Sequence, residues 1–259
     1  MKKIEIKGGL GNQMFQYAYG RALSVAGEKI LFVKNFPKNG MRSFRLDVYN
    51  ISDKINFIDK KNNYIKNKFE AILSYLNIKK EDGYYQSEDY FKNIKSLIKQ
   101  EFSPKTISST TKELESKIKN STNPTAIHIR RSDYLNKNNI KLFHICDKKY
   151  YIDSINQIIN LKKEKNTDFF IFTDDIKWAK ENLSEIEKIF FISDKKLQEY
   201  EEIYLMSVCK NNIISNSTFA WWGAWLNKNG DKIVIAPKYW FKNKLTTNTN
   251  IIPKEWITI

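Results

Sequence analysis

Short apolar runs alternate with helix-like patterns through the second half of the chain. Five runs predict buried strands, and they cover residues 125–129, 169–172, 189–192, 213–214 and 233–235. Between them, apolar residues recur at the three- to four-residue spacing of an amphipathic helix. Strands that alternate with helices predict a parallel sheet covered on both faces, the doubly wound α/β arrangement. Ligands bind such sheets at the carboxyl ends of the strands.

The first residues predict a strand, a glycine loop and a helix. Residues 4–7 alternate like a strand, three glycines interrupt the pattern, and apolar residues then follow at helical spacing. An apolar run at 30–33 completes a βαβ start. Residues 36–122 are rich in Lys and Asn and give mixed signals, so we assign no elements there.

A chain of 259 residues is long enough for two domains with separate cores. Residues 116–124 are polar and end in a proline just before a predicted strand, which is typical of a linker. We therefore expect one α/β domain at residues 1–120 and a second at residues 121–259.

Composition limits the function classes. Hydrophobic residues make up 41% of the chain and charged residues 28%, as in ordinary globular proteins. The formal net charge of +15 comes mostly from scattered lysines, which indicates a solvated surface that attracts anions at short range. A nucleotide donor and a membrane surface are both anionic and would suit this basic surface. A basic nucleic-acid-binding protein is the alternative, although no helix-turn-helix, RNA-recognition or zinc signature is present.

Other features concern location and metals. The start of the chain lacks the apolar segment of a signal peptide and no stretch is long enough to span a membrane, so we expect a cytoplasmic protein, with peripheral membrane contact as an option. Cys146 and Cys209 are too few for a disulfide scaffold or a Cys-based zinc site and are expected to be free thiols. The Asp-x-Asp motif of metal-dependent sugar transferases is absent, so we expect no metal and no cofactor.

The segment Gly8-Gly9-Leu10-Gly11-Asn12-Gln13 lies between the first predicted strand and helix. Three of the nine glycines of the chain fall in its first four positions. Glycine lets the backbone approach a ligand closely, and a helix N-terminus presents free N–H groups to an anion. The spacing fits neither the dinucleotide-binding G-x-G-x-x-G pattern nor the Walker A pattern. The segment predicts an anion-binding loop, and a tight strand-to-helix turn without a ligand is the alternative.

The segment His128-Ile129-Arg130-Arg131-Ser132-Asp133-Tyr134 follows the carboxyl end of a strand. His128 and Arg130 are two residues apart and share one strand face. The chain has only five arginines among its 44 basic residues, and two are adjacent here. A guanidinium offers phosphate oxygens a rigid bidentate fork. We predict that Arg130 binds phosphate; the alternatives are a core histidine at position 128 and a structural Arg131–Asp133 pair.

Two further segments follow strand ends. Asp174 and Asp175 directly follow a buried strand and could accept hydrogen bonds from a ribose or a base, although one of them could instead cap the next helix. Ser217 and Thr218 begin the next predicted helix, where hydroxyls and free N–H groups could hold a diphosphate; capping alone is the alternative. Trp221 lies off the apolar stripe of that helix and is the tryptophan expected to face a cleft.

Together these segments resemble the bacterial and animal α-1,2-fucosyltransferases, glycosyltransferase family 11. The resemblance rests on residues 8–17, 128–134, 172–175 and 215–222, in the order of the family. It implies a GT-B-like fold of two Rossmann-like domains facing across a cleft, with the acceptor side in the first domain and GDP-fucose bound by the second. It also implies inverting transfer of L-fucose from GDP-β-L-fucose to the 2-hydroxyl of a glycan, typically a β-galactoside. Another GDP-sugar donor is the alternative.

The resemblance also implies roles for single residues. Arg130 would bind the β-phosphate, His128 and one of the two aspartates the guanosine, and Asn12 the fucose or a phosphate. The predicted donor-binding residues are Gly9, Gly11, Asn12, Gln13, His128, Arg130, Arg131, Asp174, Asp175, Ser217, Thr218 and Phe219. The predicted catalytic residues are Arg130, Asn12 and Asp133, the last as a candidate base. Acceptor choice is expected to reside in residues 36–122, and the acceptor glycan is free or lipid-linked.

Overall fold

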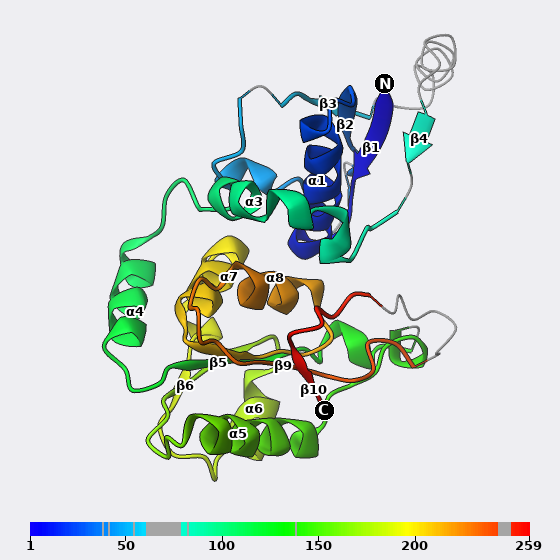
Figure 1. Cartoon of the computed structure of the whole chain (residues 1–259). Coiled ribbons are helices and arrows are strands. Elements are labelled where there is room, and N and C mark those ends of the chain that lie inside the picture. Colours follow the sequence, from blue (N-terminus) through cyan, green and yellow to red (C-terminus); the bar gives the residue numbers. More distant parts are fainter. Residues whose placement is uncertain are drawn as a thin grey trace. The chain divides into compact units, whose positions relative to one another are not determined.

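A computed structural model describes residues 1–37, 39–40, 42–53, 55–60, 79–81, 83–137, 139–242 and 250–259. They form two compact units, Met1–Lys105 and Thr106–Ile259 (Figure 1). Helix α4 (Ser109–Lys119) belongs to the second unit, because the backbone N–H of Ser108 donates to Glu201 at 2.7 Å and the Lys117 ammonium lies 3.7 Å from the centre of the Phe190 ring. The division therefore precedes α4 instead of following residue 120, and the predicted linker includes the end of a helix.

The first unit is built on a four-stranded parallel sheet. Its strands are β1 (Lys2–Ile6), β2 (Ile30–Lys34), β3 (Phe57–Asp59) and β4 (Lys79–Glu81), in the order β3-β2-β1-β4. Its helical elements are α1 (Leu10–Val25), α3 (Lys95–Glu101) and the 3-10 turns η1 (Leu46–Val48), η2 (Glu88–Tyr90) and η3 (Lys92–Ile94). Since β2 and β4 flank β1, the strand order reverses at β1, and the carboxyl ends of β1 and β4 meet at a topological switch point.

Helix α1 lies close against this sheet. Its apolar residues Met14, Phe15 and Ala18 are fully buried. Gly20 allows the close approach, since a Cβ atom at this position would lie 2.5 Å from the ring of Phe32 on β2. The predicted strand, loop and helix are therefore present, and they position the glycine loop at the carboxyl edge of the sheet.

The second unit contains a six-stranded parallel sheet. Its strands are β5 (Thr125–Ile129), β6 (Phe169–Thr173), β7 (Ile189–Phe191), β8 (Asn211–Ile213), β9 (Val234–Ala236) and β10 (Ile257–Thr258), in the order β10-β9-β8-β5-β6-β7. Read from β7, this is the 3-2-1-4-5-6 order of the Rossmann fold. The doubly wound sheet and its five predicted strands are confirmed. The two-residue strand β10 is too short to give a recognisable apolar run.

Helices cover both faces of this sheet. They are α5 (Lys148–Lys162), α6 (Ile176–Asn182), α7 (Glu199–Val208) and α8 (Thr218–Leu226), with 3-10 turns η4 (Asp133–Leu135), η5 (Asn139–Lys141) and η6 (Ser193–Lys195). Figure 1 shows α5 and α6 on one face and α7 and α8 on the other. Among all the residues that the structure describes, in both units, no helix is long and apolar enough to cross a membrane.

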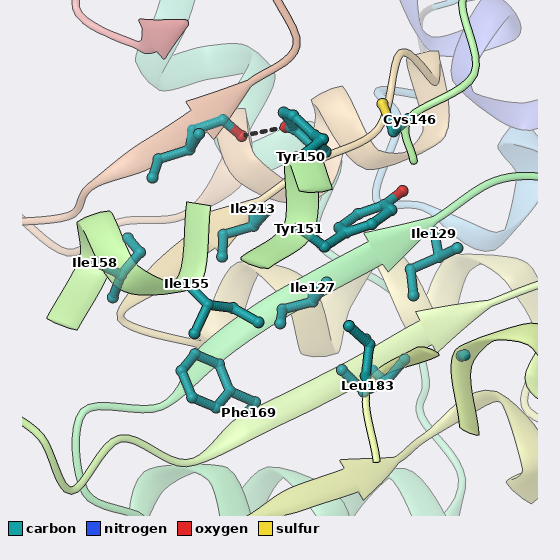
Figure 2. Close-up of a cluster of buried hydrophobic side chains, with 13 residues drawn as sticks. Ile127, Ile129, Cys146, Tyr150, Tyr151, Ile155, Ile158, Phe169, Leu183 and Ile213 are labelled. Atoms are coloured by element: carbon teal, nitrogen blue, oxygen red, sulfur yellow. Dashed lines mark hydrogen bonds between the residues drawn. The ribbon is translucent and has the colours of Figure 1, made fainter. Parts of the chain in front are cut away.

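Helix α5 and the sheet enclose an apolar core (Figure 2). Ile155 and Ile158 of the helix lie against Ile127 and Phe169 of the strands. The buried Tyr150 hydroxyl donates to the carbonyls of Ile214 at 2.6 Å and Ile235 at 3.4 Å, so its polar atom is satisfied. Cys146 and Cys209 are buried free thiols, as predicted.

The prediction that Trp221 faces a cleft is wrong. Its side chain is 0% exposed, and its indole N–H donates to the carbonyl of Ile251 at 2.7 Å. The indole packs against Trp222, Trp225 and Trp256. Helix α8 is buried on all sides from Ala220 onward, so its sequence has no solvent-facing stripe from which a cleft could be inferred.

Candidate active site

The carboxyl ends of β5 and β8 meet at the switch point of the second unit. These two strands are paired, and two hydrogen bonds join the segments that leave them. The Nδ1 atom of His128 lies 2.8 Å from the Ser215 hydroxyl, and the Tyr134 hydroxyl donates to the Asn216 carbonyl at 2.9 Å. In doubly wound sheets the ligand crevice lies at this place. Asp174, after the neighbouring strand β6, accepts the backbone N–H of Arg131 at 2.8 Å, so three of the four segments singled out in the sequence come together at one sheet edge.

Two carboxylates hold the guanidinium of Arg130 from one side. Its Nε atom donates to Asp133 Oδ1 at 2.8 Å and lies 3.2 Å from Asp174 Oδ2. Burial lowers the pKa of Arg130, but the hydrogen bond with Asp133 and the charge of Asp174 outweigh it and raise the pKa above its ordinary value. Among the hydrogen bonds of the described residues, Arg130 donates only from Nε, so its two terminal amino groups remain available as a fork for a ligand.

The Arg131–Asp133 pair expected as an alternative is wrong. Asp133 begins the 3-10 turn η4, and its carboxylate accepts the Nε–H of Arg130, three residues earlier in the chain. Arg131 instead lies over the Trp178 ring at 4.2 Å, with its Nε atom 3.4 Å from Asp175 Oδ2. This approach lacks hydrogen-bond geometry, and the buried Nε has no other partner in the part of the chain that is described. Arg131 is therefore held by stacking and charge.

The two aspartates after β6 have different tasks. Asp175 caps helix α6, because its carboxylate accepts the N–H of Trp178 at 3.0 Å. Asp174 accepts the backbone N–H of Arg131 at 2.8 Å and orients Arg130. The capping alternative therefore holds for Asp175. A contact of either residue with a guanosine stays a prediction.

The N-terminus of helix α8 has no side-chain cap. Ser217 is the N-cap residue, but its side chain makes no capping hydrogen bond. Neither its hydroxyl nor that of Thr218 has a partner among the described residues, and the first N–H groups of a helix lack acceptors within it. The partial positive charge of the helix end favours an anion there. Phe219 is half-buried, with its ring centre 5.6 Å from that of His128.

His128 is a buried neutral histidine. Burial and then the charge of Arg130 lower its pKa to about 3. Its Nδ1 atom is occupied by Ser215, so a ligand could contact only Nε2. His128 is therefore buried, as the core-histidine alternative expected. The predicted contact of His128 with the guanosine stays a prediction.

The pKa of His128 predicts a pH dependence of stability. In the unfolded chain a histidine titrates near a pKa of about 6.5, so below that pH the unfolded state binds a proton that the native state lacks. The free energy of unfolding should fall by up to about 1.4 kcal/mol per pH unit below about pH 6.5. Urea unfolding of the wild type and His128→Gln at pH 7.5, 6.5 and 5.5 checks this, and the variant should show a shallower fall. Equal slopes would contradict it.

In the first unit, the glycine loop also lies at a switch point. Gly8 has a φ of 81°, which favours glycine, and Gly9 is the N-cap residue of α1, while Gly11 lies in the first turn. Asn12 Oδ1 accepts a hydrogen bond from Gln86 Nε2 at 2.9 Å, which joins the segments after β1 and β4. The predicted contacts of Gly9, Gly11 and Asn12 with a donor stay predictions.

The side-chain amide of Gln13 is used within the first unit, and its predicted donor contact stays a prediction. Its side chain is 1% exposed, and its amide donates to the carbonyls of Gly8 and Ser43, each at 2.9 Å. Its amide oxygen accepts the backbone N–H of Arg45 at 2.9 Å. Because these backbone groups use the amide, Gln13 holds the glycine loop and the 43–45 segment together.

Comparison with known proteins identifies the family. Residues 1–259 match the model of glycosyl transferase family 11. The chain belongs to this family. This family 11 glycosyltransferase is 36% identical to the α-1,2-colitosyltransferase of Escherichia coli, with 98% of this chain and 97% of the relative covered. It is 30% identical to the Escherichia coli O-antigen biosynthesis glycosyltransferase WbnK, over 94% of this chain and 97% of that protein.

Solved structures of other glycosyltransferases share the fold. The NodZ α-1,6-fucosyltransferase from Bradyrhizobium, in crystals soaked with GDP-fucose, has a TM-score of 0.54 at 11% identity, covering 87% of this chain and 91% of NodZ. A family 9 glycosyl transferase from Veillonella parvula has a TM-score of 0.51 at 10% identity, covering 100% of this chain and 84% of that chain. The predicted family and the GT-B-like α/β fold class are therefore confirmed.

Sequence reasoning assigned no role to two residues that shape the site of this glycosyltransferase. Asn216 is fully buried, and its amide donates to the carbonyls of His144 and Trp240, each at 2.7 Å. Tyr134 is bonded to the Asn216 carbonyl. Both lie inside the segments that were singled out, but their partners are distant in sequence, so no local pattern marks them.

Proposed function

We propose that this glycosyltransferase moves L-fucose from GDP-β-L-fucose to the 2-hydroxyl of a β-galactoside and forms an α-1,2 linkage with inversion. The observation that carries the proposal is the guanidinium of Arg130, which is held through Nε at the β5–β8 switch point with its terminal amino groups available. The 36% identity with an α-1,2-colitosyltransferase supports the linkage. The likeness to a fucosyltransferase soaked with GDP-fucose supports the donor.

Charge on the leaving GDP is the main problem that the site must solve. As the bond between the anomeric carbon and the β-phosphate oxygen breaks, the sugar passes through an oxocarbenium-like state and negative charge gathers on the diphosphate. The terminal amino groups of Arg130 and the first N–H groups of α8 stabilise that charge, helped by the hydroxyls of Ser217 and Thr218. The acceptor oxygen attacks from the opposite face of the sugar, forms the new bond to the anomeric carbon and loses its proton to water. The proposal needs no metal ion, so transfer should persist in EDTA.

We assign Asp133 a positioning role instead of that of the base. Its Oδ1 atom is bound to the Arg130 guanidinium at 2.8 Å, so this oxygen is already used in holding the arginine. With a good leaving group and a loose transition state, transfer needs little help from a base. Asp133 therefore serves the reaction by aiming Arg130.

The function is tested by offering the enzyme GDP-fucose, GDP-colitose and GDP-mannose with a panel of β-galactosides. We expect an α-1,2-fucosylated product, identified by NMR linkage analysis. Colitose is favoured as a second donor by the 36% identical relative, and it is L-fucose without the 3-hydroxyl. A site that hydrogen-bonds this hydroxyl should prefer GDP-fucose by about 10⁴-fold in kcat/KM. If the enzyme prefers GDP-colitose, then colitose and not fucose is the sugar that it transfers. Transfer from none of the three donors would refute the proposal.

A further inference from the structure

A row of polar side chains continues along the carboxyl edge of the second sheet beyond Arg130. Asp174 follows β6, and its carboxylate lies 3.2 Å from the Nε atom of Arg130. The Ser193 hydroxyl, in the turn η6 after β7, accepts the backbone N–H of Thr173 at 2.9 Å. The same hydroxyl donates a hydrogen bond to Glu202 of helix α7. The row therefore leads from the proposed diphosphate site across β6 to a carboxylate beside β7.

Glu202 is a carboxylate that lacks a cationic partner among the described residues. Within that part of the chain, the Ser193 hydroxyl is its one hydrogen-bond donor. Burial, and then the charges of Glu199 and Asp174, raise the pKa of Glu202 to about 7, against the lowering effect of the Ser193 hydrogen bond. Glu202 is only half-buried, so a ligand can still reach it. Since a carboxylate can accept several hydrogen bonds, Glu202 suits a ligand that brings more than one donor.

The place of Glu202 along the sheet edge favours the base of a nucleotide as this ligand. The diphosphate is proposed to lie at β5 and β8, between Arg130 and the start of α8. In the strand order β8-β5-β6-β7, with adjacent strands about 4.8 Å apart, β6 and β7 lie about 10 and 14 Å from β8. The ribose of a nucleotide lies between its diphosphate and its base. A nucleotide that extends from Arg130 past Asp174 therefore brings its base, and not its ribose, nearest to Glu202.

We propose that Glu202 selects guanine by accepting hydrogen bonds from the N1–H group and the 2-amino group of the base. These two donors are adjacent on one edge of guanine and match the two oxygens of a carboxylate. Adenine has an unprotonated ring nitrogen at position 1, which a carboxylate would repel. The inference rests on the proposed function, because it presupposes a GDP-linked sugar donor. It names the residue that distinguishes GDP from other nucleoside diphosphates.

The test compares the binding of GDP, IDP, ADP and UDP to the full chain by calorimetry, without an acceptor. IDP is the matched probe, because its base keeps the N1–H group and lacks the 2-amino group. We expect the wild type to bind GDP at least about tenfold tighter than IDP, because IDP forfeits a hydrogen bond to a charged group. Glu202→Gln should reduce this preference to about threefold or less, because its amide has one acceptor oxygen in place of two.

Two further measurements separate base recognition from a structural role. Glu199→Gln removes a carboxylate one turn away on the same helix and should keep the wild-type preference for GDP over IDP. Without nucleotide, Glu202→Gln should unfold at the temperature of the wild type or above it, because it removes a carboxylate that Glu199 and Asp174 repel. A lower unfolding temperature together with an unchanged GDP preference would make Glu202 a structural residue and overturn the inference.

Other outcomes also contradict the choice of guanine. Equal binding of GDP and IDP to the wild type overturns it, and so does a GDP preference that survives in Glu202→Gln. A loss of affinity in this variant that is equal for GDP, IDP and ADP would assign Glu202 to the ribose instead. Failure of the proposed function gives a different result, because the wild type would then bind ADP or UDP more tightly than GDP.

Discussion

Replacement of Arg130 by lysine is expected to lower kcat for sugar transfer by about two to three orders of magnitude. Lysine keeps the charge, but it cannot supply two parallel N–H donors, and Asp133 and Asp174 would attract its single ammonium away from the diphosphate. Loss of one donor that acts on transition-state charge typically costs 10²–10³ in kcat. Steady-state rates at saturating GDP-fucose and acceptor measure the effect.

Two variants control this experiment. Arg21→Lys alters another guanidinium–carboxylate pair, in which Arg21 Nε lies 2.9 Å from Glu101, and should leave kcat unchanged. Asp133→Asn should lower kcat by about tenfold, because it weakens one of the two contacts that aim Arg130. Near-full activity of Arg130→Lys would refute the argument from bidentate geometry.

Trp221→Ala is expected to lower the free energy of unfolding by about 3–5 kcal/mol. The substitution empties the space of a fully buried indole and leaves the carbonyl of Ile251 without its donor. Equilibrium unfolding in guanidinium chloride at pH 7.5 measures the loss.

The milder variant Trp221→Phe separates packing from sugar binding. It keeps most of the aromatic volume and loses the hydrogen bond, so it should cost about 1–2 kcal/mol and keep the wild-type acceptor KM. A wild-type stability for both variants together with a raised acceptor KM would instead place Trp221 at a glycan site.

The second unit was predictable because its central strands β5, β6, β8 and β9 are buried on both faces. Such strands appear as continuous apolar runs, of which residues 169–172 are the clearest example. The first unit was predictable only at its start. Strands β3 and β4 have three residues each and lie among Lys- and Asn-rich segments, so no periodic signal marks them. Residues 61–78, part of the region expected to choose the acceptor, lie outside the described residues.

By itself, the sequence determined the α/β fold class and the strand ends that carry polar segments, because burial and glycine placement leave local patterns. It indicated the family through the resemblance of its motifs to those of known members. Only the tertiary structure decided which hydrogen-bond and ion-pair partners those side chains have. Asp133 binds Arg130, three residues earlier in the chain, whereas Asp174 accepts the backbone N–H of Arg131, which is 43 residues away in sequence. The side-chain amide of Gln13 donates to the carbonyl of Ser43, which is 30 residues away in sequence. Such pairings depend on which strands become neighbours, and no spacing within a single segment encodes that.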